Sequence, residues 1–300
     1  MESGSAILMN NNYLQPNLQV SQRLAKAVEC ASDDNTIEDN PDGVVGCLRE
    51  QNATYLAYVL WSLDPTSIAA FFPQYGDELL PNNAVDDIRE GSFTNAVPLL
   101  IGSNKDEGSF LITTQNPEIF GFFGYKDPEI NKPYAESMLL KIFSNFTDPQ
   151  KYVNYYMDGV PDDDYDLIRR QVYTAAGDIM FLCVTVYFAE SYAERNNDVY
   201  FYFSLTALVT LHGRPGWGSH TSKKFNLCLE DHTYSPILIV KILGSSSETR
   251  HPGMFLKGPK YSKANPTYMN IDVNPSINRA KLGTGPHLEN CNVIRSHYGF

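Results

Sequence analysis

A charged tripeptide, Lys105-Asp106-Glu107, follows a short apolar run at positions 97–102. A run of that length is typical of a buried strand, and a turn after such a strand can hold a carboxylate in a fixed place. A fixed carboxylate can orient a histidine, hold it in one tautomer and stabilise its protonated form. Spacing alone favours a solvated charged turn, but it leaves Glu107 as a candidate acid for a triad, which also needs a base and a nucleophile.

The base of such a triad has six candidates in this chain. They are His212, His220, His232, His251, His287 and His297. The nucleophile is harder to place, because no G-x-S-x-G, the sharp turn that exposes a catalytic serine, occurs in the 300 residues.

The segment 97–111, VPLLIGSNKDEGSFL, closely resembles the type-B carboxylesterase and cholinesterase family, a group of α/β-hydrolases. The segments FFPQYGDELLP, GDIMFLC and DVYFYF resemble other family motifs and stand in the family's order, the first with Asp and Gly exchanged. The opening MESGSA resembles the segment shortly after the family's nucleophile elbow. The resemblance extends over almost the whole chain except about residues 221–257.

The resemblance implies that residues 1–300 form the C-terminal portion of an α/β-hydrolase, with a mostly parallel central sheet flanked by helices. The nucleophile elbow and the glycine-rich oxyanion loop are then expected upstream of Met1. Glu107 takes the place of the family's catalytic acid. The catalytic histidine follows the aromatic strand through a loop containing W-x-G-x-x-H, which points to His220, 17 residues after Phe203. His212 has the neighbouring Gly that the family histidine has, but it lies nearer the strand and is the alternative.

The stretch after His220 departs from the family, since TSKKFNLCLEDH lacks the expected G-x-E. Genuine divergence, alternative splicing and an altered reading frame are each open as explanations of residues 221–257.

The expected function is hydrolysis of a small-molecule carboxylic ester, with no cofactor. Ala69 and Ala70 stand where larger rings often line the acyl pocket, which favours a broad ester specificity over an acetylcholinesterase-like one. Phe110 can face a cationic substrate or belong to the core. Two further alternatives are a non-catalytic, neuroligin-like adhesion protein and a fragment without an independent role. Without its serine, the chain alone is expected to be inactive.

Composition excludes several classes of protein. A formal charge of -12 argues against a general nucleic-acid binder, which needs a basic face. The content of 43% hydrophobic and 19% charged residues argues against wholesale disorder. We find no uncharged apolar run of 18 residues and therefore predict no transmembrane segment. The cysteines and histidines lack zinc-site spacing, so no metal site is expected, and oligomeric state is left open.

The cysteines and the glycosylation sequons indicate the cellular compartment of the protein. Cys30 and Cys47 flank a polar, turn-rich loop, where they can form a bridge or stand as two free thiols. The family resemblance implies bridges Cys30–Cys47 and Cys183–Cys291, with Cys228 unpaired.

Two glycosylation sequons begin at Asn52 and Asn145. Together with the expected bridges they predict a secreted glycoprotein, whose signal peptide would precede this chain.

Helical periodicity predicts helices over residues 22–29, 45–60, 133–143 and 164–195. Apolar or aromatic runs predict strands over residues 97–102, 198–204 and 267–271. Long helices between short strands indicate a layered α/β fold.

Overall fold

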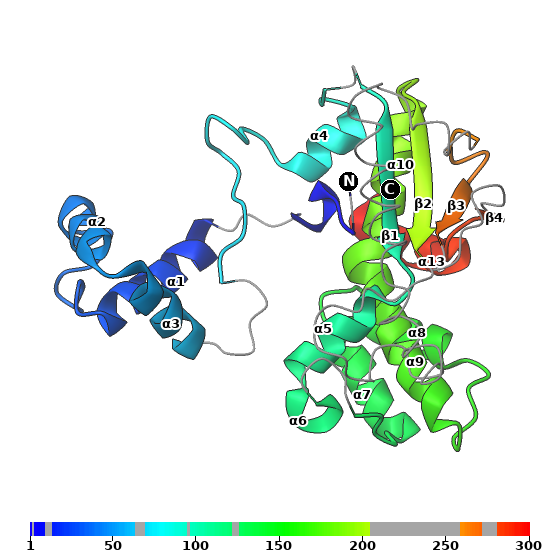
Figure 1. Ribbon diagram of the computed structural model, residues 1–300, viewed down its shortest axis with the longest axis horizontal. Coiled ribbons are helices and arrows are strands. Elements are labelled where there is room, and N and C mark those ends of the chain that lie inside the picture. Colours follow the sequence, from blue (N-terminus) through cyan, green and yellow to red (C-terminus); the bar gives the residue numbers. More distant parts are fainter. Residues whose placement is uncertain are drawn as a thin grey trace, which may run out of the picture. The chain divides into compact units, whose positions relative to one another are not determined.

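The computed structural model describes residues 1, 3–9, 14–63, 70–94, 97–121, 126–204, 259–271 and 281–300 (Figure 1). The chain divides into two compact units. The large unit comprises Met1–Leu8 and Val85–Phe300, and the small unit comprises Met9–Ala84.

The large unit contains a four-stranded sheet in the order β1-β2-β3-β4. The strands are β1 (Leu99–Asn104), β2 (Val199–Ser204), β3 (Thr267–Ile271) and β4 (Lys281–Thr284). The pairs β1–β2 and β2–β3 are parallel, and β3–β4 is antiparallel. The sheet is thus mostly parallel, as expected, and the three predicted strands are confirmed, with β1 displaced by two residues toward the C-terminus.

Burial explains why the aromatic run at residues 199–204 forms a strand. Five of the six β2 residues are buried. A parallel strand covered on both faces needs such a nearly continuous hydrophobic sequence. In register, Gly102 lies opposite Tyr202, and a Cβ on this glycine would meet the Tyr202 carbonyl oxygen at 2.2 Å.

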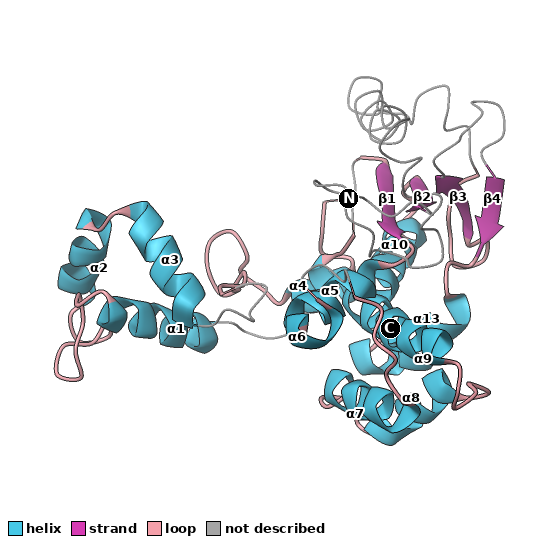
Figure 2. Ribbon diagram, turned by 60° about the horizontal axis from the view of Figure 1, so that its bottom comes forward, coloured by secondary structure: helices cyan, strands magenta, loops and turns pink. Residues whose placement is uncertain are grey.

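The helices of the large unit lie against the sheet and below it in Figure 2. α10 packs against β1, β2 and α13, while α5 packs mainly against α9. In chain order the helices are η1 (Ala6–Met9), α4 (Ala84–Glu90), α5 (Glu107–Gln115), α6 (Pro117–Phe120), α7 (Lys132–Ile142), α8 (Pro149–Met157), α9 (Tyr165–Gly177), a π-helical turn (Asp178–Leu182), α10 (Cys183–Glu194) and α13 (Leu288–Tyr298).

The predicted helix over residues 164–195 is therefore one helical stretch with a π-helical turn at its centre. Residues 165–194 are also long and apolar enough to cross a membrane, but 72% of their most apolar window is buried inside the protein. A helix at the centre of a protein core meets the same criteria. The absence of a transmembrane segment accordingly stays a prediction.

A disulfide between Cys183 and Cys291 joins the start of α10 to α13, and both cysteines are fully buried. The second disulfide, Cys30–Cys47, lies in the small unit. Both expected bridges are confirmed, and Cys228 lies outside the described residues.

The small unit is helical, with α1 (Leu14–Ala27), α2 (Pro41–Glu50) and α3 (Ala53–Leu63) around a core that includes Val44 and Val59. The prediction of one helix over residues 45–60 is wrong. The Gln51 backbone N–H bonds back to the Leu48 carbonyl, and the Asn52 side chain accepts a bond from the Tyr55 backbone N–H. These contacts end one helix and begin the next.

Candidate active site

Glu107 is the first residue of α5, directly after the two-residue turn that follows β1. Its side chain is half-buried. A negative charge at this place interacts favourably with the helix dipole, because the first backbone N–H groups of a helix have no partner within it. Strand β1 and helix α5 thus hold the carboxylate at the carboxyl end of a parallel strand, as the sequence predicts.

Three donors fix one oxygen of this carboxylate. Glu107 Oε1 accepts hydrogen bonds from the Ser3 hydroxyl, from the Asn104 backbone N–H at 2.8 Å and from the Ser103 hydroxyl at 3.3 Å. Ser3 is itself anchored to β1, because its backbone N–H bonds to the Gly102 carbonyl at 2.9 Å. Within the described part of the chain, Oε2 has no hydrogen-bond partner. That oxygen can accept a bond from an imidazole N–H.

A second carboxylate, Asp178, lies nearby and is only 1% exposed. Its Oδ1 lies 2.7 Å from His287 Nδ1. Its Oδ2 accepts bonds from the Tyr156 hydroxyl at 2.9 Å and from Asn290 Nδ2 at 2.6 Å. Tyr155 extends the network by donating to Asn290 Oδ1 at 2.9 Å. A buried charge needs such partners to offset its lost hydration.

The network also changes the acid–base properties of its members. Burial, followed by the charge and hydrogen bond of Asp178, raises the pKa of Tyr156 well above its usual value. Burial by itself would lower the pKa of His287, but the hydrogen bond and charge of Asp178 outweigh that effect and raise it above 6.5.

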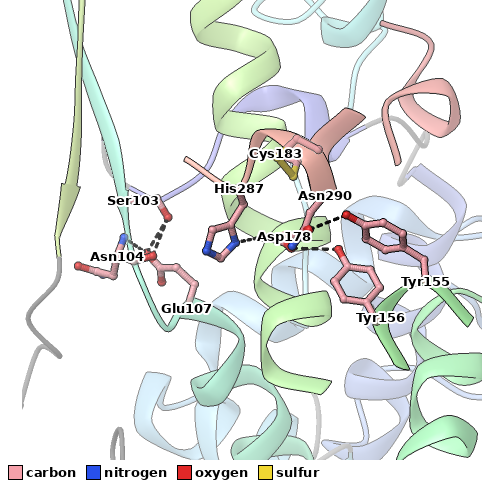
Figure 3. Close-up of polar contacts among 10 residues, drawn as sticks. Ser103, Asn104, Glu107, Tyr155, Tyr156, Asp178, Cys183, His287 and Asn290 are labelled. Atoms are coloured by element: carbon pink, nitrogen blue, oxygen red, sulfur yellow. Dashed lines mark hydrogen bonds and ion pairs between the residues drawn. A yellow bond between two sulfur atoms is a disulfide. The ribbon is translucent and has the colours of Figure 1, made fainter. Parts of the chain in front are cut away.

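Both carboxylates border one small cavity of about 10 Å³, close to the space needed for a single water molecule. The turn 104–107, the end of α9, Asp178 and His287 line it. Figure 3 shows the His287 ring between the two carboxylates, with Nδ1 toward Asp178 and the rest of the ring on the side of Glu107.

The sequence-predicted base cannot be compared with this geometry. His220 and the alternative His212 lie outside the described residues, as does Ala69. Phe110 is half-buried on α5, and its role toward a cation stays a prediction.

Sequence reasoning did not single out the partners of Glu107 or the pair Asp178–His287. Ser103 flanks the charged tripeptide, and Ser3 and Asp178 fall inside segments quoted for the family resemblance. The sequence therefore contains these three residues within recognisable motifs, but it does not show which residues they contact. His287 appeared only as one of six histidines.

The arrangement suits acid–base chemistry. Among the described residues, no three His, Cys, Asp or Glu side chains are grouped to hold a metal ion. A carboxylate with one oxygen fixed and the other available can orient an imidazole, which is the role of the acid in a hydrolase triad.

A mostly parallel sheet flanked by helices, with a carboxylate after a buried strand, defines a partial α/β-hydrolase. The model of the carboxylesterase family matches residues 1–236, and the chain belongs to that family.

Its relatives include three acetylcholinesterases. Acetylcholinesterase-1 of Trittame loki is 28% identical, over 99% of this chain and 56% of the relative. The enzyme of Leptinotarsa decemlineata is 24% identical, over 97% of this chain and 47% of the relative. That of Bungarus fasciatus is 28% identical over 55% of this chain and 27% of the relative. The chain thus spans about half the length of the first two relatives.

Proposed function

We propose that this chain supplies the acid and the base of a serine carboxylic-ester hydrolase. The observation that carries the proposal is the Glu107 carboxylate, held through Oε1 by three donors at the end of β1. Membership of the carboxylesterase family supports it. The nucleophilic serine would come from sequence corresponding to the part of the relatives that this chain does not span.

In the completed site, His220 takes the proton of the serine hydroxyl as the oxygen attacks the ester carbonyl. The protonated imidazole then gives that proton to the departing alkoxide. Glu107 accepts the other imidazole N–H, holds the ring in the reactive tautomer and stabilises its positive charge. Water repeats the sequence on the acyl-enzyme and releases the acid.

The substrate class is a small carboxylic ester. Choline esters are the narrower candidate, since relatives over most of this chain are named acetylcholinesterases. We further propose that the protein is secreted and glycosylated. Its two disulfides suit an oxidising compartment, and both sequon asparagines, Asn52 and Asn145, are exposed.

The test is turnover of a short-chain nitrophenyl ester and of an acetylcholine analogue by the protein completed with a segment carrying G-x-S-x-G. Glu107→Gln should lower kcat by orders of magnitude with little change in KM, because the lost interaction acts on the transition state. Glu118→Gln is the matched control, since Glu118 is an exposed glutamate on α6 of the same unit. Full activity of Glu107→Gln would refute the role of Glu107.

The base is tested in the same assay. His220→Ala should be as inactive as Glu107→Gln, since the two residues act as one unit. Full activity of His220→Ala would exclude His220 and direct the search for the base to His212.

A further inference from the structure

We propose that Asp178 and His287 form a positioning pair for Glu107, and that the charge of His287 adjusts where the Glu107 carboxylate lies. The description of Glu107 as catalytic rests on the function proposed above. The coupling between the charge of His287 and the position of the Glu107 carboxylate does not rest on it. Among the described residues, Asp178 and His287 bond to each other and neither bonds to Glu107, so the pair is distinct from the three donors that hold the Glu107 carboxylate.

The backbone of His287 is the first observation. This residue has φ 45° and ψ 37°, the left-handed region that is unfavourable for a residue with a Cβ. Such a conformation persists only where the surrounding contacts hold it, and it is concentrated at functional sites. The bond from the ring to Asp178 is one such contact, and the bond from the Cys291 backbone N–H to the His287 carbonyl at 2.9 Å is another.

The position of Asp178 is the second observation. It opens the π-helical turn between α9 and α10, and such turns are rare and frequent at functional sites. Both of its oxygens are engaged, and it is nearly fully buried. The pair therefore lies at the place where the long helical stretch departs from α-helical geometry.

A direct backbone contact connects this place to Glu107. Gly108 follows Glu107, Gly177 precedes Asp178, and the two glycines touch. A Cβ on Gly108 would meet the Tyr173 carbonyl oxygen at 1.8 Å and the Gly177 nitrogen at 2.4 Å. With no side chain between them, we expect a backbone displacement at Asp178 to reach the start of α5.

The titratable and charged groups around His287 come from six places. Among the described residues they are Asp178 on the π-helical turn, Lys105 and Asp106 on the turn after β1, Glu107 on α5, Tyr155 and Tyr156 on α8 through the Asp178 network, Tyr173 on α9, and Glu289 on α13.

Asp178 is the main source of attraction for a protonated His287. Asp106 adds to it, and Lys105 opposes it. Protonation of His287 therefore tightens its bond to Asp178, and deprotonation loosens the bond. Because the pKa of His287 is raised, this change takes place above pH 6.5.

The experiment follows the amide of Gly108 by NMR through a pH titration of the 300-residue chain. Two Glu–Gly steps occur in the sequence, Glu90–Gly91 and Glu107–Gly108. Labelling glutamate with ¹³C at the carbonyl and glycine with ¹⁵N therefore selects two signals. Gly91 directly follows α4 and lies next to the Arg195 side chain, so it serves as the internal reference.

We expect the Gly108 signal to shift in a single-proton step above pH 6.5, with no such step for Gly91. The step should vanish in His287→Gln and persist in His297→Gln. His297 is a matched control, because it lies on α13, stacks on Phe146 and has a pKa lowered by burial.

Three results would overturn the proposal: a Gly108 signal without a step, equal steps at both glycines, or a step that survives in His287→Gln. If His287→Gln fails to fold, Asp178→Asn takes its place and should move the midpoint down, whereas an unchanged midpoint contradicts the coupling. No turnover is measured, so a failure here is distinct from a failure of the proposed hydrolase activity.

Discussion

Replacing Gly108 by alanine tests how rigidly the Glu107 helix rests on α9. The added Cβ would lie 1.8 Å from the Tyr173 carbonyl oxygen, about half an ordinary contact distance of 3.5–4.0 Å. The opposing atoms belong to the backbone and cannot rotate away, so α5 or α9 must move. Overpacking costs about 1–3 kcal/mol, and we expect about 3 kcal/mol here because no rotamer change relieves it.

Two other glycines make the test a graded series. A Cβ on Gly177 would meet the Gly108 nitrogen at 2.9 Å, so Gly177→Ala should cost less than Gly108→Ala. A Cβ on Gly46, within α2, meets no atom within 4 Å, so Gly46→Ala should stabilise its helix by about 0.5–1 kcal/mol.

Thermal unfolding followed by circular dichroism measures the series, and each kcal/mol lowers Tm by about 2–4 °C in a domain of this size. The completed enzyme should also lose activity in Gly108→Ala, because Glu107 moves with the helix. If Gly108→Ala unfolded within about 0.5 kcal/mol of the unsubstituted chain, the contact would be compliant and our account of the positioning of Glu107 would be refuted.

Replacing Cys183 and Cys291 by alanine should lower the free energy of unfolding in urea by about 4–5 kcal/mol, because this bridge closes a loop of 108 residues. Removing the Cys30–Cys47 bridge of the small unit should lower it by only about 3 kcal/mol, because its loop spans 17 residues. Equal losses would contradict the loop-entropy account. The pH dependence of stability has a definite sign, because a histidine with a raised pKa stabilises the fold fully below pH 6.5 and less as the pH rises through its folded-state pKa. Asp178→Asn should flatten that part of the stability curve, and an unchanged slope would exclude His287 as its source. Material from secretory cells should lose mass on enzymatic removal of N-glycans, by less in Asn145→Gln, and absence of any mass change would contradict the secreted route.

The elements that sequence analysis predicted best are those with a local cause. The aromatic run of β2 and the apolar run of β1 are short, bounded and buried, so composition identifies them as strands. The division between α2 and α3 was missed because apolar residues continue across it at helical spacing. The break depends on hydrogen bonds at Gln51 and Asn52, which periodicity does not report.

The candidate site likewise has one part that local sequence predicts and one part that it does not. Glu107 was predicted from the family motif in which it stands, and the residues that position it, β1 and its turn, adjoin it in the chain. The pair of Asp178 and His287 is separated by 109 residues, and the bond from Ser3 to Glu107 spans 104. Contacts of that range depend on how helices and strands pack, and no local pattern encodes them.

The Cys183–Cys291 bridge has a consequence for how this sequence can vary. It encloses residues 205–258, a stretch within which the match to the carboxylesterase family model ends, at residue 236. The entropy of closing a loop grows only with the logarithm of its length, so doubling the loop costs only about 0.6 kcal/mol. Insertions and deletions inside this covalent ring are therefore nearly neutral for the joining of α10 to α13. Changes of length in residues 205–258 therefore leave the covalent frame beside Glu107 in place, provided that they still deliver His220 to the Glu107 carboxylate.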